Sequence, residues 1–146
     1  ESRTEWEKRY DTQPPEIKWF IIERKDGSKI GFIVHFHVLH LGTGTKQLEI
    51  GYTMVPSERG KGYGTEAVKI AVDYLFLSRE TMRIQACTDV RNLASQKVLE
   101  KAGFKKEGIV RKRIFVRGNW RDEFLYSILR EEWKEPKILT RTTSEM

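Results

Sequence analysis

Residues 48–75 read LEIGYTMVPSERGKGYGTEAVKIAVDYL and place a strand, a glycine-rich loop and a helix in one unbroken stretch. Apolar side chains alternate along Leu48–Val55, as in a strand, and a period near 3.6 then follows at Val68, Ala71, Val72 and Leu75. Between the two patterns, the run Arg59–Gly64 carries three glycines at alternate positions. Glycine lets the backbone turn tightly and approach a ligand closely, because no Cβ stands in the way. The helix start adds unpaired N–H groups and a positive dipole end, so the loop is predicted to hold a phosphate.

Spacing excludes two other kinds of glycine loop. A Walker A loop needs Ser or Thr after its Gly-Lys pair, whereas Lys61 is followed by Gly62. A dinucleotide-binding fingerprint needs its third glycine two residues further along the chain. The run is therefore interpreted as a pyrophosphate cradle to which Arg59 and Lys61 add positive charge. On the loop alone, a glycine-rich connection with solvated basic residues remains the alternative.

The composition fits one folded domain. The chain has 146 residues, of which 38% are apolar and 11% aromatic, a size that suits a single core. We expect one domain over residues 1–135 and a polar tail over residues 136–146. No stretch approaches the roughly 18 continuous apolar residues of a membrane span, and the single cysteine, Cys87, excludes an internal disulfide. We expect a cytoplasmic protein without a membrane partner, in which Cys87 is a small buried side chain and not a nucleophile.

The net charge is +6, from 27 basic and 21 acidic residues, and favours polyanionic partners in general. The densest basic cluster consists of Arg111, Lys112, Arg113, Arg117 and Arg121. We expect this cluster to form solvated faces of a hairpin, and because few aromatic residues interleave with it, nucleic acid is not expected as a partner. His35 and His37 share one strand face, but no further Cys or His completes a metal site. We therefore expect no metal and interpret the two histidines as a surface or cleft-lining pair.

Alternation and turn signals predict the order of elements. Strands are expected over residues 17–24, 29–40, 48–55, 81–88, 104–116 and 120–129. One helix ends near residue 77, a second runs from an Asn92 cap to Gly103, and residues 1–10 are compatible with the end of another. Short turns make the first three strands and the last two antiparallel, whereas the helical crossover makes the third and fourth parallel. The prediction is an α+β fold, a mostly antiparallel mixed sheet with helices on both faces.

Three segments carry a resemblance to a known family: the strand at residues 48–55, VPSERGKGYGTEA at residues 55–67, and NLASQKVLEKAGF at residues 92–104. They are similar to motifs of the GCN5-related N-acetyltransferase (GNAT) family. The ending, GNWRD at residues 118–122 and YSIL at residues 126–129, is similar to the branch that acetylates ribosomal-protein N-termini. The resemblance covers residues 17–133 and implies a sheet with a central splay. It departs from the family in one respect, since the strand and helix that usually open the fold are missing from the sequence pattern.

The resemblance implies acetyl-coenzyme A as the donor and direct transfer of its acetyl group to an amine. The residues expected to bind this donor are Met54, Val55, Arg59, Gly60, Lys61, Gly62, Tyr63, Gly64, Thr65 and Asn92. In the family the strand that ends at Met54 and Val55 splays from the next one, so that its free backbone groups can bond the pantetheine arm. Such an edge can also offer an N–H to polarise the thioester carbonyl.

Transfer to an amine needs a base, because an ammonium cannot attack a carbonyl, and the pKa is about 8 for an α-amine and about 10.4 for lysine. Glu49 is the candidate, directly or through a water; its alternative is an exposed strand glutamate. Ser95 is the candidate proton donor for the departing thiolate, and Tyr126 is the fallback. The alternative for Asn92 and Ser95 is a local role at the start of a helix.

The predicted function is an acetyl-CoA-dependent N-acetyltransferase whose acceptor is a primary amine, first of all a protein N-terminal α-amine. A small amine such as a polyamine, an amino sugar or an amino acid is the nearest alternative. A coenzyme A-binding module without catalytic activity is a second alternative, motivated by the missing opening elements. The sequence does not determine the acceptor or the oligomeric state.

Overall fold

A computed structural model describes residues 17–139 of the chain. Its strands are β1 (Lys18–Glu23), β2 (Lys29–Leu39), β3 (Lys46–Met54), β4 (Arg83–Asp89), β5 (Lys105–Val116) and β6 (Asn119–Leu129). Its helices are the short 3-10 turn η1 (Pro56–Glu58), α2 (Tyr63–Ser78), α3 (Leu93–Lys101) and α4 (Arg130–Trp133). The six predicted strands and the helices that follow the glycine loop and Asn92 are confirmed, whereas α4 was not predicted. The helix expected at residues 1–10 lies outside the described residues, and so the predicted lack of the family's opening strand and helix stays a prediction.

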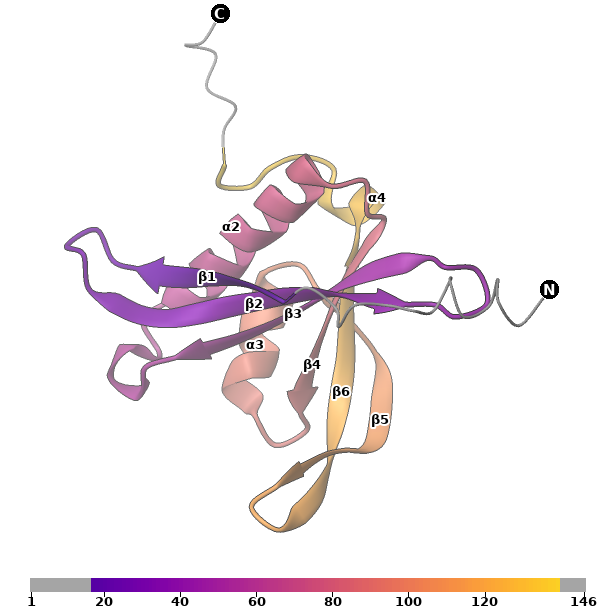
Figure 1. The fold of residues 1–146 in the computed structure, drawn as a ribbon. Helices are drawn as coiled ribbons and strands as arrows, with labels where there is room; N and C mark the ends of the chain where they lie inside the picture. The colour runs from indigo at the N-terminus through magenta and orange to yellow at the C-terminus, as the bar shows by residue number, and fades with distance from the viewer. Residues whose placement is uncertain (1–16, 140–146) are drawn as a thin grey trace, which may run out of the picture.

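The sheet consists of two antiparallel halves joined by a short parallel contact. The strand order is β1-β2-β3-β4-β6-β5. β3 pairs with β2 from Lys46 to Met54 but with β4 only over Leu48–Ile50, while β4 stays paired with β6 as far as Asp89. Beyond Ile50 the two strands therefore point apart, as Figure 1 shows. This separation confirms the predicted splay, and the space between the diverging ends is called the gap below.

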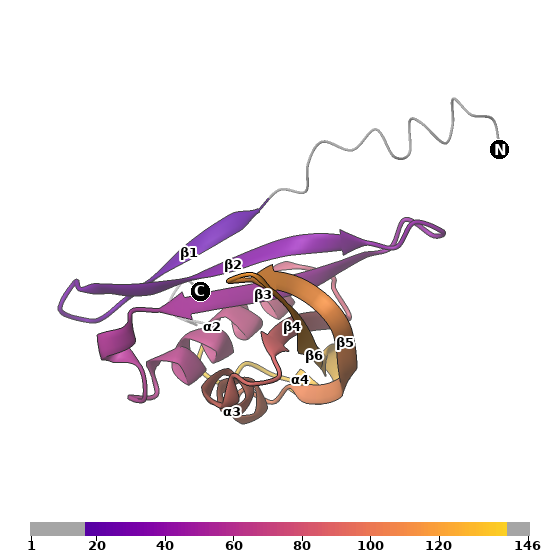
Figure 2. The same cartoon turned by 90° about the horizontal axis from the view of Figure 1, so that it is seen from below.

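The helices of the described chain pack on one face of the sheet, where α2 and α3 lie side by side (Figure 2). The largest fully buried apolar side chains come from α2, α3 and the strands beneath them and are Tyr126, Phe76, Leu48, Ile50, Leu75, Ile84, Leu99 and Val68. The expectation of helices on both faces is therefore wrong for residues 17–139, because the apolar sides of α2 and α3 meet the same side of the sheet. None of the helices described is long and apolar enough to cross a membrane.

The other side of the sheet is called the open face, since no helix among residues 17–139 packs on it. Successive side chains alternate between the two faces of a strand, so the open face carries Glu49 of β3 and its register partners Phe36 and Gln85. On β1 this face is apolar, and Trp19 is 59% exposed. Cys87 of β4 lies on the same face, half-buried, and burial raises the pKa of its thiol to about 11. This agrees with the expectation that Cys87 is not a nucleophile.

His35 and His37 lie on the core side of β2, not on the open face. His35 is 2% exposed, and its ring stacks on that of Phe20 with centroids 5.0 Å apart. The interpretation of the two histidines as a surface or cleft-lining pair is therefore wrong for His35. In the part of the chain that the structure describes, no group of three or more His, Cys, Asp or Glu side chains could hold a metal ion.

Asp73 of α2 anchors the segment that follows α4. Its fully buried carboxylate accepts hydrogen bonds from the indole of Trp133 at 2.8 Å and from the main-chain N–H groups of Lys137, Ile138 and Leu139 at 2.7–3.0 Å. Burial alone would raise the pKa of Asp73, but these hydrogen bonds outweigh it and hold the pKa below its ordinary value. The first residues of the predicted tail are thus tied to the domain.

Asp73→Asn should destabilise the protein by roughly 2–3 kcal/mol near neutral pH, because an amide cannot satisfy every donor that the carboxylate accepts and buried N–H groups lose their partner. The ionised carboxylate stabilises the fold above the ordinary pKa of about 3.9, and this contribution is lost as the pH falls through the lower pKa of the folded state. Urea unfolding near pH 7 and near pH 3 measures both effects. Equal losses of stability on acidification in the two proteins would contradict this role.

Candidate active site

The glycine loop ends where α2 begins, and its geometry suits an anion. Gly60 and Gly62 have φ values of 76° and 84°, in the left-handed region that residues with a Cβ rarely adopt. Gly62 is the N-cap of α2, and no side chain of the described chain caps this helix. The N–H groups of Tyr63, Gly64 and Thr65 therefore open on the loop at the positive end of the helix dipole. This arrangement binds phosphate in other proteins.

The two basic residues of the loop are partly held by the protein itself. Arg59 donates from Nε to the carbonyl of Met54 at 3.1 Å, which ties the loop to the end of β3. Lys61 is exposed, and its Nζ lies 3.4 Å from a carboxylate oxygen of Glu58. Both cations border the loop, so their predicted role in binding phosphate is compatible with the geometry and stays a prediction.

β3 turns main-chain groups toward the gap, but not at every predicted position. The N–H of Val55 donates to the carbonyl of Ile30 at 2.8 Å, and the Val55 carbonyl accepts from the N–H of Glu58 at 2.9 Å. Because the hydrogen-bonding direction alternates along an antiparallel strand, the main-chain groups of Tyr52 and Met54 face the gap. Both groups of Val55 are therefore used within the protein, and so is the Met54 carbonyl, which accepts from Arg59 Nε. The predicted backbone contacts of Met54 and Val55 with the donor stay predictions.

Ser95 and Tyr52 form a pair of hydroxyl groups on the core side of the gap. The Tyr52 hydroxyl donates to the Ser95 carbonyl at 3.1 Å and lies 2.6 Å from Ser95 Oγ, which then donates to it. Burial raises the pKa of Tyr52, and the hydrogen bond with Ser95 offsets only part of the rise. Tyr52 was missed by the sequence reasoning, although its alternation with Leu48 and Ile50 already placed it on the core side of β3.

Asn92 fixes the start of α3. Its Oδ1 accepts from the N–H of Ser95 at 3.1 Å, so the predicted helix cap is confirmed. The amide of Gln96 adds a hydrogen bond to the carbonyl of Val90 at 3.0 Å, which holds the turn between β4 and α3. The predicted contact of Asn92 with the donor stays a prediction.

Tyr126 lies inside the core and does not reach the gap. Its side chain is fully buried, and its hydroxyl donates to the carboxylate of Glu100 at 3.0 Å. Burial, together with this acceptor, raises the pKa of Tyr126 to about 12. Of the two candidate proton donors, Ser95 is therefore the one whose hydroxyl, with that of Tyr52, lies next to the gap.

Glu49 lies on the open face, one residue before the pairing of β3 with β4 ends. It is 7% exposed, and both carboxylate oxygens have partners: Oε1 accepts from Gln85 Nε2 at 2.7 Å and Oε2 from Arg113 Nη2 at 3.3 Å. The alternative of an exposed strand glutamate is therefore wrong. Each oxygen still has a lone pair to offer, so the carboxylate can take a proton at the edge of the gap.

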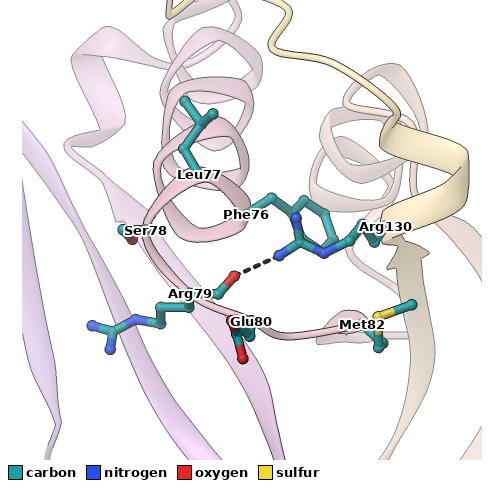
Figure 3. Close-up of a pocket in the computed structure, with 7 residues that line it drawn as sticks. All are labelled: Phe76, Leu77, Ser78, Arg79, Glu80, Met82 and Arg130. Atoms are coloured by element: carbon teal, nitrogen blue, oxygen red, sulfur yellow. Dashed lines mark hydrogen bonds between the residues drawn. The ribbon is translucent and has the colours of Figure 1, made fainter.

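A hollow of about 310 Å³ lies at the C-terminal end of α2, the opposite end from the glycine loop (Figure 3). Arg130 reaches across it and donates to the carbonyls of Thr81 at 2.8 Å and Arg79 at 2.5 Å. Its guanidinium also lies 5.0 Å from the ring centroid of Phe76. Because Arg130, the first residue of α4, is tied by these contacts to α2 and to the loop between α2 and β4, we assign the hollow to the scaffold and not to a reaction site.

Comparison with known proteins identifies the family. Residues 1–105 match the family described as Acetyltransferase (GNAT) domain. The chain is 39% identical over 126 residues to the probable N-acetyltransferase YjcK of Bacillus subtilis, which covers 86% of this chain and 68% of YjcK. It is 31% identical over 84 residues to the ribosomal protein uS5-alanine N-acetyltransferase of Escherichia coli, which covers 58% of this chain and 43% of that enzyme.

A solved structure supports the same family assignment. RimJ of Mycobacterium smegmatis, determined in complex with CoA-disulfide, has a TM-score of 0.74 and 32% identity and covers 82% of this chain and 56% of its own. The chain spans about two thirds or less of the length of these three proteins. It belongs to the GNAT acetyltransferase family, whose acetyl donor is acetyl-coenzyme A. The predicted family, fold and donor are thereby confirmed.

Gly62→Ala should weaken binding of coenzyme A several-fold, because a Cβ in the left-handed region costs roughly 1–2 kcal/mol and shifts the N–H groups at the start of α2. Titration calorimetry with coenzyme A measures the affinity. Gly118→Ala is the matched control, since Gly118 has a φ of 79° in the β5–β6 turn: it should lower the melting temperature without changing the affinity. Unchanged affinity in Gly62→Ala would contradict the cradle.

Proposed function

We propose that this protein transfers the acetyl group of acetyl-coenzyme A to the α-amine of a protein N-terminus. The observation that carries the proposal is the position of Glu49, a carboxylate on the open face at the point where β3 and β4 separate. The helix start at Gly62 and the hydroxyl pair of Ser95 and Tyr52 belong to the core side of the sheet. Donor and acceptor thus approach the gap from opposite faces.

The residues around the loop and gap fit the donor. The N–H groups of residues 63–65 suit its pyrophosphate, and the main-chain groups of Tyr52 together with the N–H of Met54 suit an arm that carries amides. A main-chain N–H on this edge is placed to polarise the acetyl carbonyl, which gains negative charge during transfer. The donor itself supplies an activated acetyl thioester.

The protons move between the substrates and three side chains. Glu49 takes a proton from the incoming ammonium, directly or through a water, and the free amine nitrogen bonds to the acetyl carbon as the carbon–sulfur bond breaks. Ser95 gives its hydroxyl proton to the departing sulfur. The Tyr52 hydroxyl turns from the Ser95 carbonyl to Ser95 Oγ and returns a proton to it, and solvent restores the proton of Tyr52 while Glu49 releases its own. An α-amine suits this base better than a lysine does, because its pKa is about 8 and not about 10.4.

The charges on the open face favour an acceptor with a single ammonium. Each acidic side chain near Glu49 is paired with an arginine: Glu49 and Glu123 with Arg113, Glu107 with Arg83, and Asp89 with Arg121. A polyamine needs further unpaired carboxylates for its distal ammonium groups, whereas a protein N-terminus needs one site. The similarity to the uS5-alanine enzyme supports the same choice.

A cytoplasmic location is part of the proposal. Cys87 is a free thiol, which fits a reducing compartment, and new ribosomal proteins offer their N-termini there. The amine acceptor remains the principal partner, and the absence of a nucleic-acid partner stays a prediction.

Glu49→Gln should lower turnover near pH 7 by about 100-fold or more, the usual contribution of a general base. Part of the loss should be recovered at higher pH, where the amine loses its proton to water. The assay follows thiol release from acetyl-coenzyme A with a peptide that starts with alanine. Glu80→Gln, a change on the exposed loop that follows α2, is the control and should leave turnover unchanged.

Three outcomes of this assay would overturn parts of the proposal. Undiminished turnover of Glu49→Gln near pH 7 would remove Glu49 as the base. Thiol release with spermidine, an amino sugar or an amino acid but not with the peptide would replace the acceptor. Tight binding of coenzyme A with no release for any amine would favour a binding module without transferase activity.

Ser95→Ala and Tyr52→Phe should each lower turnover about tenfold or more, and the double variant should be little worse than either single one, because two residues that act as a unit are not additive. Steady-state kinetics with the same peptide measures this. Tyr126→Phe removes a buried hydroxyl bonded to Glu100 and should lower the melting temperature without changing turnover. Loss of turnover in Tyr126→Phe alone would make Tyr126 the proton donor.

A further inference from the structure

We infer that Arg113 is a positioning residue for the proposed base: it is delivered by a bulge in the edge strand β5, crosses the open face and holds Glu49 as an ionised, oriented carboxylate. The inference rests on the proposed function and deepens it, since it names a residue on which the base depends. Arg113 lies 64 positions along the chain from Glu49. It does not touch the gap itself.

The bulge in β5 is defined by its register against β6. Val110 pairs with Glu123 and Ile114 with Arg121, so residues 111–113 face the single residue Asp122. Lys112 at the centre of the bulge has a φ of 48°, a conformation that is strained for a residue with a Cβ. Its N–H donates to Asp122 Oδ1 at 2.7 Å, which stabilises the bulge. The bulge sets the direction in which the next side chain leaves the strand.

Because the bulge directs its side chain across the open face, Arg113 bridges two carboxylates. Its Nη1 lies 2.5 Å from Glu123 Oε1 on β6, and its Nη2 lies 3.3 Å from Glu49 Oε2 on β3. The carboxylates are each 7% exposed, whereas the side chain of Arg113 is 34% exposed. Two nearly buried carboxylates on one face need a cation to remain ionised together. The single guanidinium of Arg113 supplies this cation to both carboxylates.

A second set of hydrogen bonds holds Glu49 from the other side. Arg83 donates to Gln85 Oε1 from Nε at 3.2 Å and from Nη2 at 3.0 Å, so the amide nitrogen of Gln85 must face Glu49. Arg83 is itself paired with Glu107, at 2.9 Å for Nη2 to Oε2. Gln85 fixes the orientation of the carboxylate but brings no charge. Arg113 is therefore the only cation bonded to Glu49 among residues 17–139.

The charged and titratable groups that face Glu49 come from three strands. β4 contributes the thiol of Cys87 and, beyond Gln85, the cation of Arg83; β6 contributes Glu123; and β5 contributes Arg113. β2 brings only the neutral Phe36 to the position beside Glu49. Without Arg113 the nearly buried carboxylates of Glu49 and Glu123 would have no cation bonded to both, and their mutual repulsion would be uncompensated.

The first test compares Arg113→Met with Arg113→Lys in the peptide assay. Arg113→Met should lower kcat near pH 7 about tenfold and move the acid limb of the pH–rate profile to higher pH by about one unit, while the affinity for coenzyme A stays unchanged. Arg113→Lys should restore most of the wild-type position of the acid limb, because lysine keeps the positive charge. Arg117→Met, in the turn of the same hairpin, is the matched control and should behave as wild type. An unmoved acid limb in Arg113→Met would overturn the inference.

The single cysteine provides a second test that needs no acetyl transfer. The cation of Arg113 favours the Cys87 thiolate, whereas the carboxylates of Glu49 and Glu123 oppose it. Alkylation of Cys87 by the neutral reagent iodoacetamide near pH 9 should therefore slow several-fold in Arg113→Met and accelerate in Glu49→Gln. Equal or faster alkylation in Arg113→Met would show that Arg113 does not control the charge at this cluster.

These two tests separate the inference from the proposed function. If the wild-type protein releases no thiol with any amine, the proposed function fails, and the alkylation rates still decide whether Arg113 sets the charge beside Glu49. If Arg113→Met does not fold, Glu123→Gln is used, which removes the anchor of the guanidinium without touching Glu49. Glu123→Gln should lower kcat near pH 7 at least twofold. An increase in kcat would contradict the bridge that Arg113 forms between Glu49 and Glu123.

Discussion

The short parallel contact between β3 and β4 is the constraint on which the rest of the structure depends. It holds only at Leu48–Ile50, after which each strand follows its own antiparallel neighbour and the gap opens. A parallel pair cannot be joined by a tight turn, so α2 must cross over between the two strands and must start just beyond the end of β3. α3 in turn starts beyond the end of β4. Both helix starts therefore border the gap, and the hydrogen bond between Tyr52 and Ser95 joins its two sides.

The alternation of side chains along β3 then divides the chemistry between the two faces of the sheet. Ile50 and Tyr52 point to the core and α3, while Glu49 and Gly51 point to the open face. A shift of one residue would exchange the two sets, placing a carboxylate in the core and a tyrosine among the arginines. Gly51 also has a steric role, since a Cβ there would stand 3.3 Å from Val34 on β2. The proposed proton acceptor, Glu49, and the hydroxyl of Tyr52 that bonds to the proposed proton donor are thus kept on opposite sides of one strand.

The sequence predicted what depends on neighbours along the chain and missed what depends on distant contacts. Alternation, turn signals and the Asn92 cap located the strands and the main helices, and the crossover rule predicted the parallel pair. The face on which the helices pack depends on tertiary pairing, and so the prediction of helices on both faces failed for residues 17–139. Glu49 could be named from its place on the strand before the loop. Its partners could not, because Gln85 and Arg113 come from strands whose adjacency only the sheet order reveals.

The same long-range pairing of strands changes the interpretation of the basic cluster in the β5–β6 hairpin. As a sequence, its five cations form one cluster, yet the fold divides them. Arg113 is bound to Glu49 and Glu123, and Arg121 to Asp89, so these two face inward to the site. Of the five, only the side chains of Arg111, Lys112 and Arg117 form no ion pair with an acidic residue among residues 17–139. Three solvated cations around a strained turn can contact few phosphates. Each phosphate contact adds only about one unit to the slope of log affinity against log salt concentration, so the salt dependence of binding would be small. The positive charge of this hairpin is therefore used first to pair the carboxylates of the sheet, and only the remainder is available to a polyanion.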